Sequence, residues 1–428
     1  MTASHRALHS AAAEAVLAEC RPIGKVFAAA GYRLYLVGGS VRDLIDGRPI
    51  DEPDFDFTTD ALPKATKELI APLADALWTQ GERFGTIAAH VGGRLVEITT
   101  HRAEAYEPDT RKPTVSFSDD VRIDLGRRDF TINALAIEVT TPSPELIDPY
   151  GGVSDLTMRR LATPLSPQES FSDDPLRMMR AARFVARFAL TADRDLVEAV
   201  REMAARLAVV SAERIRDEFD KLLSLPDPTS GLRFLCDNGL SGQFLPELSA
   251  TIIDAVDWPA LSGDPQLRLA TVFAAARAGG HTPDVAARLR ALRSSRHTIA
   301  HLVAVTDAVG RLCEHAGRWD DASVRRFVHR RFELVDSVVA VAAAIGCREQ
   351  ANRLAAAVAA LGAREDLSTL SVPIGGREVM DALGAEAGPL IGDAMDALLA
   401  HRLVVGPLSR DEAIAFVNDW ATRRDRRP

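Results

Sequence analysis

The stretch LYLVGGSVRDL, residues 34–44, decides the fold at the start of the chain. Four apolar residues, typical of a buried strand, end at Gly38 and Gly39, and a segment with helical character follows at once. Glycines permit a sharp turn and let backbone N–H groups approach a ligand closely. The N-terminus of the helix attracts anions, and Arg42 can grip a phosphate through two hydrogen bonds. Gly38, Gly39 and Arg42 are therefore predicted to cradle phosphates; the alternative is a tight turn with Arg42 and Asp43 as a surface pair.

The next strand-like segment, DFDFTTDA at residues 54–61, supplies two carboxylates. Residues i and i+2 of a strand share a face, so Asp54 and Asp56 lie side by side and repel each other unless a cation sits between them. Carboxylates combined with substrate phosphates suit Mg²⁺, and two such ions can activate a hydroxyl and neutralise a leaving pyrophosphate. We predict that Asp54 and Asp56 hold Mg²⁺. The alternative, a solvated acidic turn, fits poorly with the alternating phenylalanines.

A third carboxylate, Glu97, stands in RLVEITTH at residues 94–101, another strand-like segment. Glu97 is predicted to join the two aspartates in one catalytic site. An exposed glutamate without a catalytic role is the alternative, because strands commonly carry such residues on their solvent face.

Length and composition favour a folded protein of two to four packed units, with 428 residues, 47% hydrophobic and 26% charged. A net charge of −9 argues against a uniformly basic nucleic-acid-coating protein, although screening still allows local basic patches. No CxxC motif occurs, so neither a disulfide framework nor a structural zinc site is expected from Cys20, Cys236, Cys313 and Cys347. No apolar run reaches the roughly 20 residues of a membrane span. The N-terminal segment is expected to form an amphipathic helix rather than a signal peptide. A cytoplasmic enzyme without membrane association is the expectation.

The order of elements predicts an α+β protein. Strand-like and helical segments interleave up to about residue 155, which favours a mixed sheet. From about residue 170 nearly every segment has helical character, with Pro and Gly between helices. We predict a mixed head at residues 1–155, a helical neck at 156–225, and a helical body and tail at 226–428.

Several motifs follow one another in a specific order. They are LVGGSVRDLIDGRP with DFDFTTDA, RFGTIAAHV with VEITTHR, EPDTRKPTVSF, GRRDFTINALA, IDPYGGVSDL, DDPLRMMRAARFVARF and ERIRDEFDKLL. Together they resemble the class II tRNA nucleotidyltransferase and bacterial poly(A) polymerase family, and most of all its CCA-adding members. The resemblance covers residues 30–250 and implies a nucleotidyltransferase head, a nucleotide-selecting helix in the neck, and tRNA binding by the body and tail.

The resemblance also assigns residues to nucleotide binding. Asp174 and Arg177, three apart on one face of a predicted helix, would pair with the Watson–Crick edge of C or A, so that the protein itself selects CTP or ATP. Arg180 and Arg183 continue this ridge and would hold the triphosphate or the base. Arg128, in GRRDF, matches the nucleotide-contacting arginine of the family. Outside the family context, these residues describe a helical ion pair beside a basic surface stripe.

Some features depart from the family pattern. Two extra residues around IDEP separate Arg42 from Asp54, which leaves Asp51 as a rival metal carboxylate. The first acid of the family's EDxxR pattern is Asp173 here, a shorter carboxylate. No His-Asp doublet occurs, so the phosphohydrolase domain of some relatives is absent or inactive. The polar segment at residues 101–120 is predicted to be mobile, and its full length speaks against an enzyme that adds only C.

Three arginine-rich segments are candidates for RNA binding: RLRALRSSRH at 288–297, RRFVHRR at 325–331 and TRRDRRP at 422–428. A tRNA needs Arg or Lys contacts to its phosphates and is recognised by shape. Each segment can instead be a solvated helix face.

The expected function is CCA addition to tRNA from CTP and ATP, with Mg²⁺ at Asp54 and Asp56 activating the 3′-hydroxyl for attack on the α-phosphate. A poly(A) polymerase or A-adding enzyme of the same family is the close alternative. A non-catalytic RNA-binding protein is the remote one.

Overall fold

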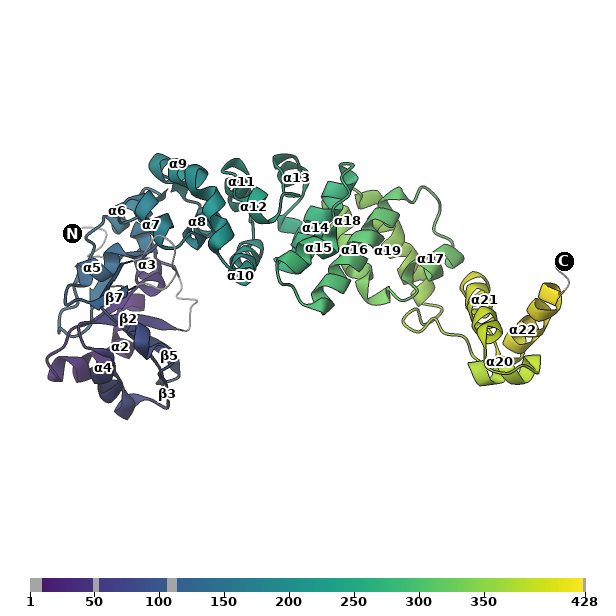
Figure 1. Cartoon of the computed structure of the whole chain (residues 1–428), viewed down its shortest axis with the longest axis horizontal. Coiled ribbons are helices and arrows are strands. Elements are labelled where there is room, and N and C mark those ends of the chain that lie inside the picture. The colour runs from purple at the N-terminus through teal and green to yellow at the C-terminus, as the bar shows by residue number, and fades with distance from the viewer. Residues whose placement is uncertain (1–9, 49–53, 106–113, 426–428) are drawn as a thin grey trace. The chain divides into compact units, whose positions relative to one another are not determined.

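The computed structural model describes residues 10–48, 54–105 and 114–425, which form two compact units, Met1–Pro246 and Glu247–Pro428. The first unit contains a sheet and helices, and the second is helical (Figure 1). The predicted α+β class is therefore confirmed. The finer division at residues 155 and 225 stays a prediction.

A seven-stranded mixed sheet forms the centre of the first unit, in the order β3-β4-β5-β2-β1-β8-β9. Its strands are β1 (Leu34–Val37), β2 (Phe55–Thr59), β3 (Ala76–Trp78), β4 (Thr86–Val91), β5 (Arg94–Thr100), β8 (Ala136–Glu138) and β9 (Leu146–Ile147). Strand β2 pairs antiparallel with β1 and parallel with β5. Two small sheets accompany it, formed by β6 (Arg102–Ala105) with β7 (Thr114–Phe117) and by β10 (Arg160–Leu161) with β11 (Thr191–Ala192).

The expected N-terminal helix is α2 (Ala11–Ala29), which packs on the sheet through Val16, Ile23 and Phe27. Its cap is Ser10, whose side chain accepts a hydrogen bond from the backbone of Ala13. The other helices of the head are α3 (Gly39–Asp46), α4 (Pro63–Ile70), α5 (Val121–Gly126) and α6 (Gly152–Thr157).

Helices after the head follow the strong apolar periodicity of the sequence. They are α7 (Pro167–Asp173), α8 (Leu176–Phe188), α9 (Arg194–Met203), α10 (Ala212–Leu223), α11 (Thr229–Asp237) and α12 (Ser241–Phe244). Helix α8 packs between α10 and α11, burying Met178, Met179 and Ala182. Its arginines Arg177, Arg180 and Arg187 are partly exposed, whereas Arg183 is buried.

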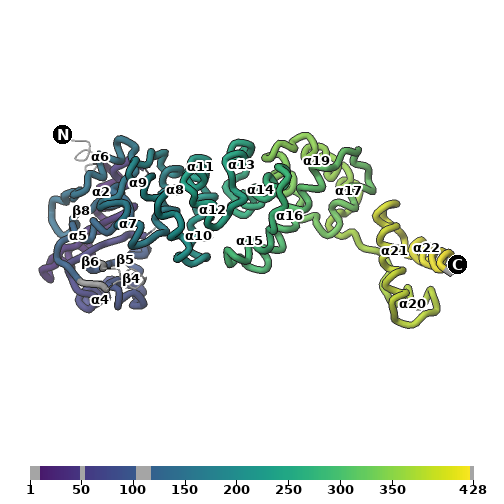
Figure 2. Tube along the Cα trace, turned by 45° about the horizontal axis from the view of Figure 1, so that its top comes forward, coloured from purple at the N-terminus to yellow at the C-terminus, as the bar shows by residue number. Residues whose placement is uncertain are grey.

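The second unit is built from α13 (Ala250–Ala255), α14 (Pro265–Ala278), α15 (Val285–Ala291), α16 (Arg296–Glu314), α17 (Asp321–Val328), α18 (Val335–Ala344), α19 (Arg348–Gly362), α20 (Gly376–Leu383), α21 (Pro389–Val405) and α22 (Arg410–Asp425). Helices α14, α16, α18 and α19 pack together. Helices α20, α21 and α22, labelled next to the C-terminus in Figure 2, surround a separate small core. In the described residues, no helix has both the length and the hydrophobicity to cross a bilayer.

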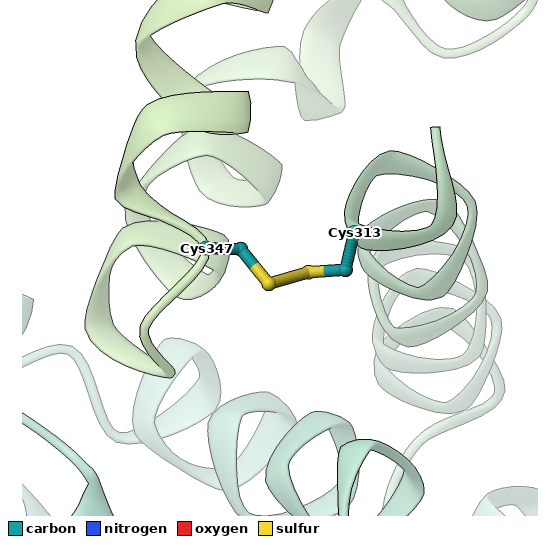
Figure 3. Close-up of a disulfide and its surroundings, with 2 residues drawn as sticks. All are labelled: Cys313 and Cys347. Carbon is teal, nitrogen blue, oxygen red and sulfur yellow. A yellow bond between two sulfur atoms is a disulfide. The ribbon is translucent and has the colours of Figure 1, made fainter. Parts of the chain in front are cut away.

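A disulfide joins Cys313, near the end of α16, to Cys347, the N-cap residue of α19 (Figure 3). The two Cα atoms lie 5.8 Å apart, within the range that a disulfide spans. This bridge was not anticipated from the cysteine spacing, which indicated no disulfide framework. Spacing does not reveal the pair because helix packing brings together residues 34 positions apart.

Candidate active site

Strand β2 presents carboxylates and aromatic rings to opposite faces. Asp54, directly before the strand, and Asp56 are exposed, whereas Phe55 and Phe57 are buried in the core of the head. The two rings meet edge to face, with centroids 6.2 Å apart. The aspartates therefore share one face, as the alternation predicts.

Glu97 lies on β5 directly opposite Asp56, in the parallel register that pairs these two strands, and it too is exposed. Within residues 10–48, 54–105 and 114–425, no group of three or more His, Cys, Asp or Glu side chains is arranged to hold one metal ion. The role of Glu97 as a third carboxylate stays a prediction. Asp51, the rival ligand, lies outside the described residues.

The glycine turn brings the backbone close to these carboxylates. Gly38, the N-cap of α3, has φ 77° and ψ −136°, a conformation that is essentially restricted to glycine. A Cβ atom at position 38 would lie 3.1 Å from Nη1 of Arg128 and 3.6 Å from Oδ2 of Asp56. The absence of a side chain at Gly38 thus leaves open the space between the carboxylate of Asp56 and the guanidinium of Arg128.

Gly38→Ala is expected to lower kcat/KM for CTP by about tenfold or more, because the methyl group enters this space and the backbone is strained by about 1–3 kcal/mol. Gly31→Ala is the matched control, since Gly31 also has a positive φ of 81° but nothing lies within 4 Å of its added Cβ. Steady-state kinetics and thermal unfolding of both variants separate the two effects. Equal losses of activity would show that backbone strain, rather than the filled space, is responsible.

Arg42 is buried rather than part of a surface pair. Its Nε donates to Oδ1 of Asp43 at 2.8 Å, and its Nη1 donates to Oδ1 of Asn133 at 2.7 Å. The guanidinium stacks on the ring of Phe188, 4.3 Å from the centroid. Its Nη2 is buried and has no hydrogen-bond partner in the part of the chain that the structure describes. A buried donor left in this way is costly unless a ligand accepts from it.

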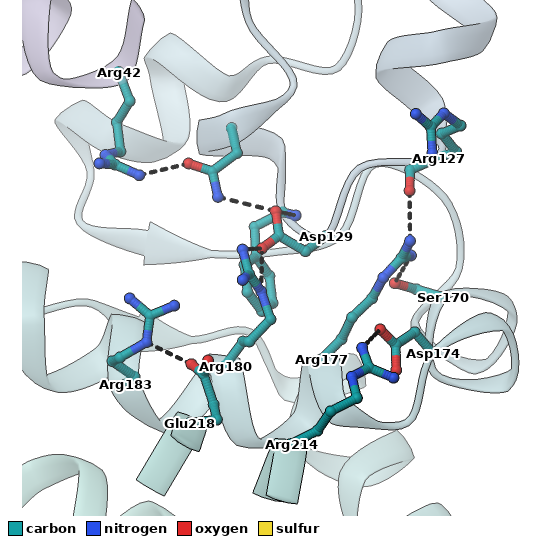
Figure 4. A network of polar contacts seen from close by, with 12 residues as sticks. Arg42, Arg127, Asp129, Ser170, Asp174, Arg177, Arg180, Arg183, Arg214 and Glu218 are labelled. Carbon is teal, nitrogen blue, oxygen red and sulfur yellow. Dashed lines mark hydrogen bonds and ion pairs between the residues drawn. The ribbon is translucent and has the colours of Figure 1, made fainter. Parts of the chain in front are cut away.

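Asp129 holds the side chains of Asn133 and Arg180 in place (Figure 4). Its Oδ1 accepts from Nδ2 of Asn133 at 2.9 Å, and its Oδ2 accepts from Nε of Arg180 at 2.8 Å. Burial alone would raise the pKa of Asp129, but attraction to Arg180 and the hydrogen bonds from Asn133 and Arg180 hold that pKa well below its usual range. Asp129 therefore stays charged and fixes Arg180 directly and Arg42 through Asn133.

Arg183, one turn after Arg180, forms a buried ion pair with Glu218 of α10. Burial lowers the pKa of Arg183, and the attraction of Glu218 only partly compensates. This pair ties α8 to α10 and fixes the direction of the arginine ridge.

These side chains surround a cavity of about 540 Å³. Its lining comprises Gly38, Gly39, Arg42, Asp56, Arg128, Asp129, Asn133, Arg180, Arg183, Phe184, Arg187, Lys221, Ser224 and Leu225. Six of these side chains are cationic and two are carboxylates. Such a surplus of positive charge around one carboxylate of β2 suits a polyphosphate that approaches a metal site.

The cavity brings together seven of the predicted residues: Gly38, Gly39, Arg42, Asp56, Arg128, Arg180 and Arg183. The sequence analysis did not assign Arg187 or Lys221 to the site. Arg187 was detectable as the next i+4 residue after Arg183 on the same helix. Lys221 was not, because its place at the cavity depends on how α10 packs against α8.

Asp174 and Arg177 lie beside the cavity lining rather than in it. Helix α7 ends at Asp173 and α8 begins at Leu176, so Asp174 has an extended backbone and does not share a helix face with Arg177. That detail of the sequence prediction is wrong, because the chain breaks between two helices. Oδ2 of Asp174 accepts from Nη2 of Arg214 at 2.7 Å, while Arg177 donates to Ser170 and to the carbonyl of Arg127 (Figure 4). Base selection by Asp174 and Arg177 stays a prediction.

Comparison with known proteins places this site in a family. Residues 34–162 match the family described as Poly A polymerase head domain, and residues 190–252 match Probable RNA and SrmB- binding site of polymerase A. A CCA-adding enzyme of Lactococcus lactis is 32% identical over 404 residues, which are 93% of this chain and 96% of that protein. The chain belongs to the CCA-adding enzyme family.

Two further CCA-adding enzymes support the assignment. One from a Geobacillus species is 40% identical over 211 residues, which cover 49% of this chain and 50% of that protein, so this chain spans about half the length of that relative in the match. The crystal structure of the Bacillus stearothermophilus CCA-adding enzyme in complex with CTP is similar with a TM-score of 0.77 and 27% identity, covering 96% of this chain and 98% of that one. The predicted family and enzyme class, nucleotidyltransferase, are confirmed. CCA-adding enzymes and their relatives generally use a divalent metal ion.

Proposed function

We propose that this chain adds C, C and A to the 3′ end of tRNA from CTP and ATP, without a nucleic-acid template, in the cytoplasm. The observation that carries the proposal is the cavity that surrounds Asp56 with six cationic side chains next to a glycine turn. This combination supplies what nucleotidyl transfer needs, which is charge neutralisation around a triphosphate and a carboxylate site for divalent cations.

Asp54 and Asp56 would hold Mg²⁺. Both are exposed on one face of β2, and like charges placed this way are relieved by a shared cation. The open space above Gly38 and the unpartnered Nη2 of buried Arg42 fit phosphate oxygens next to such ions. When bound, Mg²⁺ would lower the pKa of the tRNA 3′-hydroxyl and neutralise charge on the phosphates.

The side chains of this protein would position the triphosphate and offset its charge. The backbone at Gly39 and the guanidinium of Arg42 hold the β- and γ-phosphates, with Nη2 of Arg42 as the donor that the protein leaves unused. Arg128, Arg180 and Arg183 offset the negative charge of the departing pyrophosphate. In phosphoryl transfer, positioning and charge stabilisation of this kind supply most of the rate gain.

Selection of the base would require Asp174 and Arg177 to exchange their present partners. Arg214 holds the carboxylate of Asp174, and the carbonyl of Arg127 holds Arg177. A cytosine or adenine edge would replace these contacts with hydrogen bonds of the same donor and acceptor type. The proposed base selection therefore begins with the release of Asp174 from Arg214 and of Arg177 from the carbonyl of Arg127.

Incubation of the purified chain with Mg²⁺, labelled CTP or ATP, and tRNA that lacks its 3′ CCA tests the proposal. Incorporation of C, C and A followed by a halt is the expected result. A long A tail from ATP alone would identify a poly(A) polymerase. A parallel incubation uses tRNA ending in CC: a single A added to this tRNA alone would identify an A-adding enzyme, and no incorporation into either tRNA would identify a non-catalytic protein. Omitting Mg²⁺ is expected to abolish incorporation.

A further inference from the structure

A second basic cavity, of about 430 Å³, lies within the second unit. It is formed where the first turns of α16 meet the turn after α17 and the short helix η6 (Phe332–Leu334). Its lining comprises His297, Ala300, His301, Arg330, Arg331, Phe332, Glu333, Leu334 and Ser368. The cavity thus combines two arginines and two histidines with one carboxylate.

The arginines of this unit divide into two groups. About half of the described ones form ion pairs with carboxylates, as in the pairs Arg277–Asp307, Arg288–Glu247, Arg325–Glu365, Arg348–Asp257, Arg353–Glu349 and Arg424–Asp393. Among the described residues, neither Arg330 nor Arg331 has a carboxylate within 4.0 Å, although Glu333 lines the same cavity. Within the described part of the chain, the guanidinium of Arg331 has only a long hydrogen bond, 3.4 Å, from Nη1 to the carbonyl of Phe327. These two guanidinium groups therefore retain most of their capacity to bind an anion.

Neighbouring groups show that positive charge is in excess here. Burial lowers the pKa of Arg331, and repulsion from Arg311 lowers it further against the weaker attraction of Asp307. Burial also lowers the pKa of His329, with added repulsion from Arg330 and Arg331. Burial is the largest cause in both groups, and repulsion from nearby arginines adds to it.

The backbone at Arg330 has a strained conformation. Arg330 has φ 59°, in the left-handed region that is uncommon for residues other than glycine, asparagine and aspartate. Such a conformation costs about 1–2 kcal/mol for an ordinary residue, and it persists where neighbouring structure imposes it. Here the turn places two consecutive arginines at one cavity, whereas consecutive residues of a helix point about 100° apart.

We propose that this cavity binds phosphate groups of the tRNA backbone. Guanidinium groups match phosphate geometry through paired hydrogen bonds, and the Phe332 side chain, 39% exposed, offers the apolar surface that accompanies basic groups in RNA-binding sites. The inference rests on the proposed function for the identity of the RNA. It also assigns different roles to the arginines of RRFVHRR, because Arg325 is buried against Glu365 whereas Arg330 and Arg331 line the cavity.

The test compares two double variants that remove the same charge. Arg330→Ala with Arg331→Ala alters the cavity, and Arg348→Ala with Arg353→Ala removes two exposed, ion-paired arginines of α19. Binding of fluorescently labelled tRNA lacking CCA is measured by anisotropy over a range of salt concentrations. The cavity variant is expected to raise Kd about tenfold or more, as the loss of charge-assisted hydrogen bonds implies. Its slope of log Kd against log salt should also become shallower by about 1 for each tRNA phosphate that the variant no longer neutralises.

The control variant is expected to bind tRNA as the unaltered chain does, and the KM for CTP should stay the same in both. Unchanged affinity of the cavity variant, or an equal loss in the control, overturns the inference. Arg330→Gly with Arg331→Ala repeats the test with a residue that accepts the left-handed backbone, which excludes misfolding as the cause. Failure of the unaltered chain to extend tRNA would overturn the proposed function instead, and tRNA binding would still report on the cavity.

Discussion

Asp56→Asn is expected to lower kcat for CMP addition by about 10³-fold or more. Asparagine keeps the size of the side chain but removes the charge that would hold Mg²⁺ next to the triphosphate. Metal-based charge stabilisation supplies several kcal/mol of the barrier reduction in reactions of this kind, and each 1.36 kcal/mol corresponds to a factor of about ten. Single-turnover incorporation of labelled CMP measures the effect.

Asp75→Asn serves as the control for this variant. Asp75 is exposed, precedes the edge strand β3, and its carboxylate contacts only the His90 ring, at 3.4 Å, among the side-chain bonds of the described residues. Its loss should leave both kcat and the midpoint of thermal unfolding nearly unchanged. An Asp56→Asn enzyme that kept its normal kcat would remove the basis for the proposed metal site, because Asp56 is the carboxylate of β2 that lines the cavity.

Asp129→Asn is expected to destabilise the fold by about 2–3 kcal/mol and to raise KM for CTP and ATP. Breaking a buried ion pair costs about 3–5 kcal/mol because the remaining charge stays buried, and the value is smaller here because the Arg180 side chain is 34% exposed. Without Asp129, both Arg180 and the Asn133 that holds Arg42 lose their anchor. Denaturant unfolding and initial-rate kinetics measure the two effects.

The pH dependence of stability provides a second readout. The pKa of Asp129 is lowered in the folded state, so its stabilising contribution is complete above the unfolded pKa of about 3.9 and disappears as pH falls toward the folded pKa. The unaltered chain should therefore lose more stability below about pH 4 than the Asp129→Asn variant does. Asp393→Asn, which removes an exposed pair with Arg424, is the matched control and should cost less than about 1 kcal/mol. If stability falls with pH in the same way in all three proteins, the assigned role of Asp129 is contradicted.

Local patterns in the sequence predicted the parts of the site that depend on local geometry. The alternation of Asp54 and Asp56 with two phenylalanines determines which side chains face the core, since period-two burial is a property of any strand. The glycine pair likewise predicted the turn at Gly38, because its backbone conformation excludes other residues.

Contacts between distant segments could not be predicted in the same way. The chain of hydrogen bonds from Arg42 through Asn133 to Asp129 joins residues 91 positions apart. The Cys313–Cys347 bridge likewise depends on helix packing, which determines which cysteines meet. The break between α7 and α8, which takes Asp174 off the helix, is local in origin, because Pro175 disfavours a helical backbone at the residue before it.

The alternation along β2 makes folding and chemistry inseparable. Because Phe55 and Phe57 enter the core while Asp54 and Asp56 face outward, a shift of the strand by one residue would bury carboxylates and expose aromatic rings. A single-residue deletion within the strand would thus lower both the stability of the fold and the rate of nucleotide transfer. Changes in this segment must keep the alternation of core-facing and outward-facing residues. The connection before it can vary in length as long as the strand keeps its register.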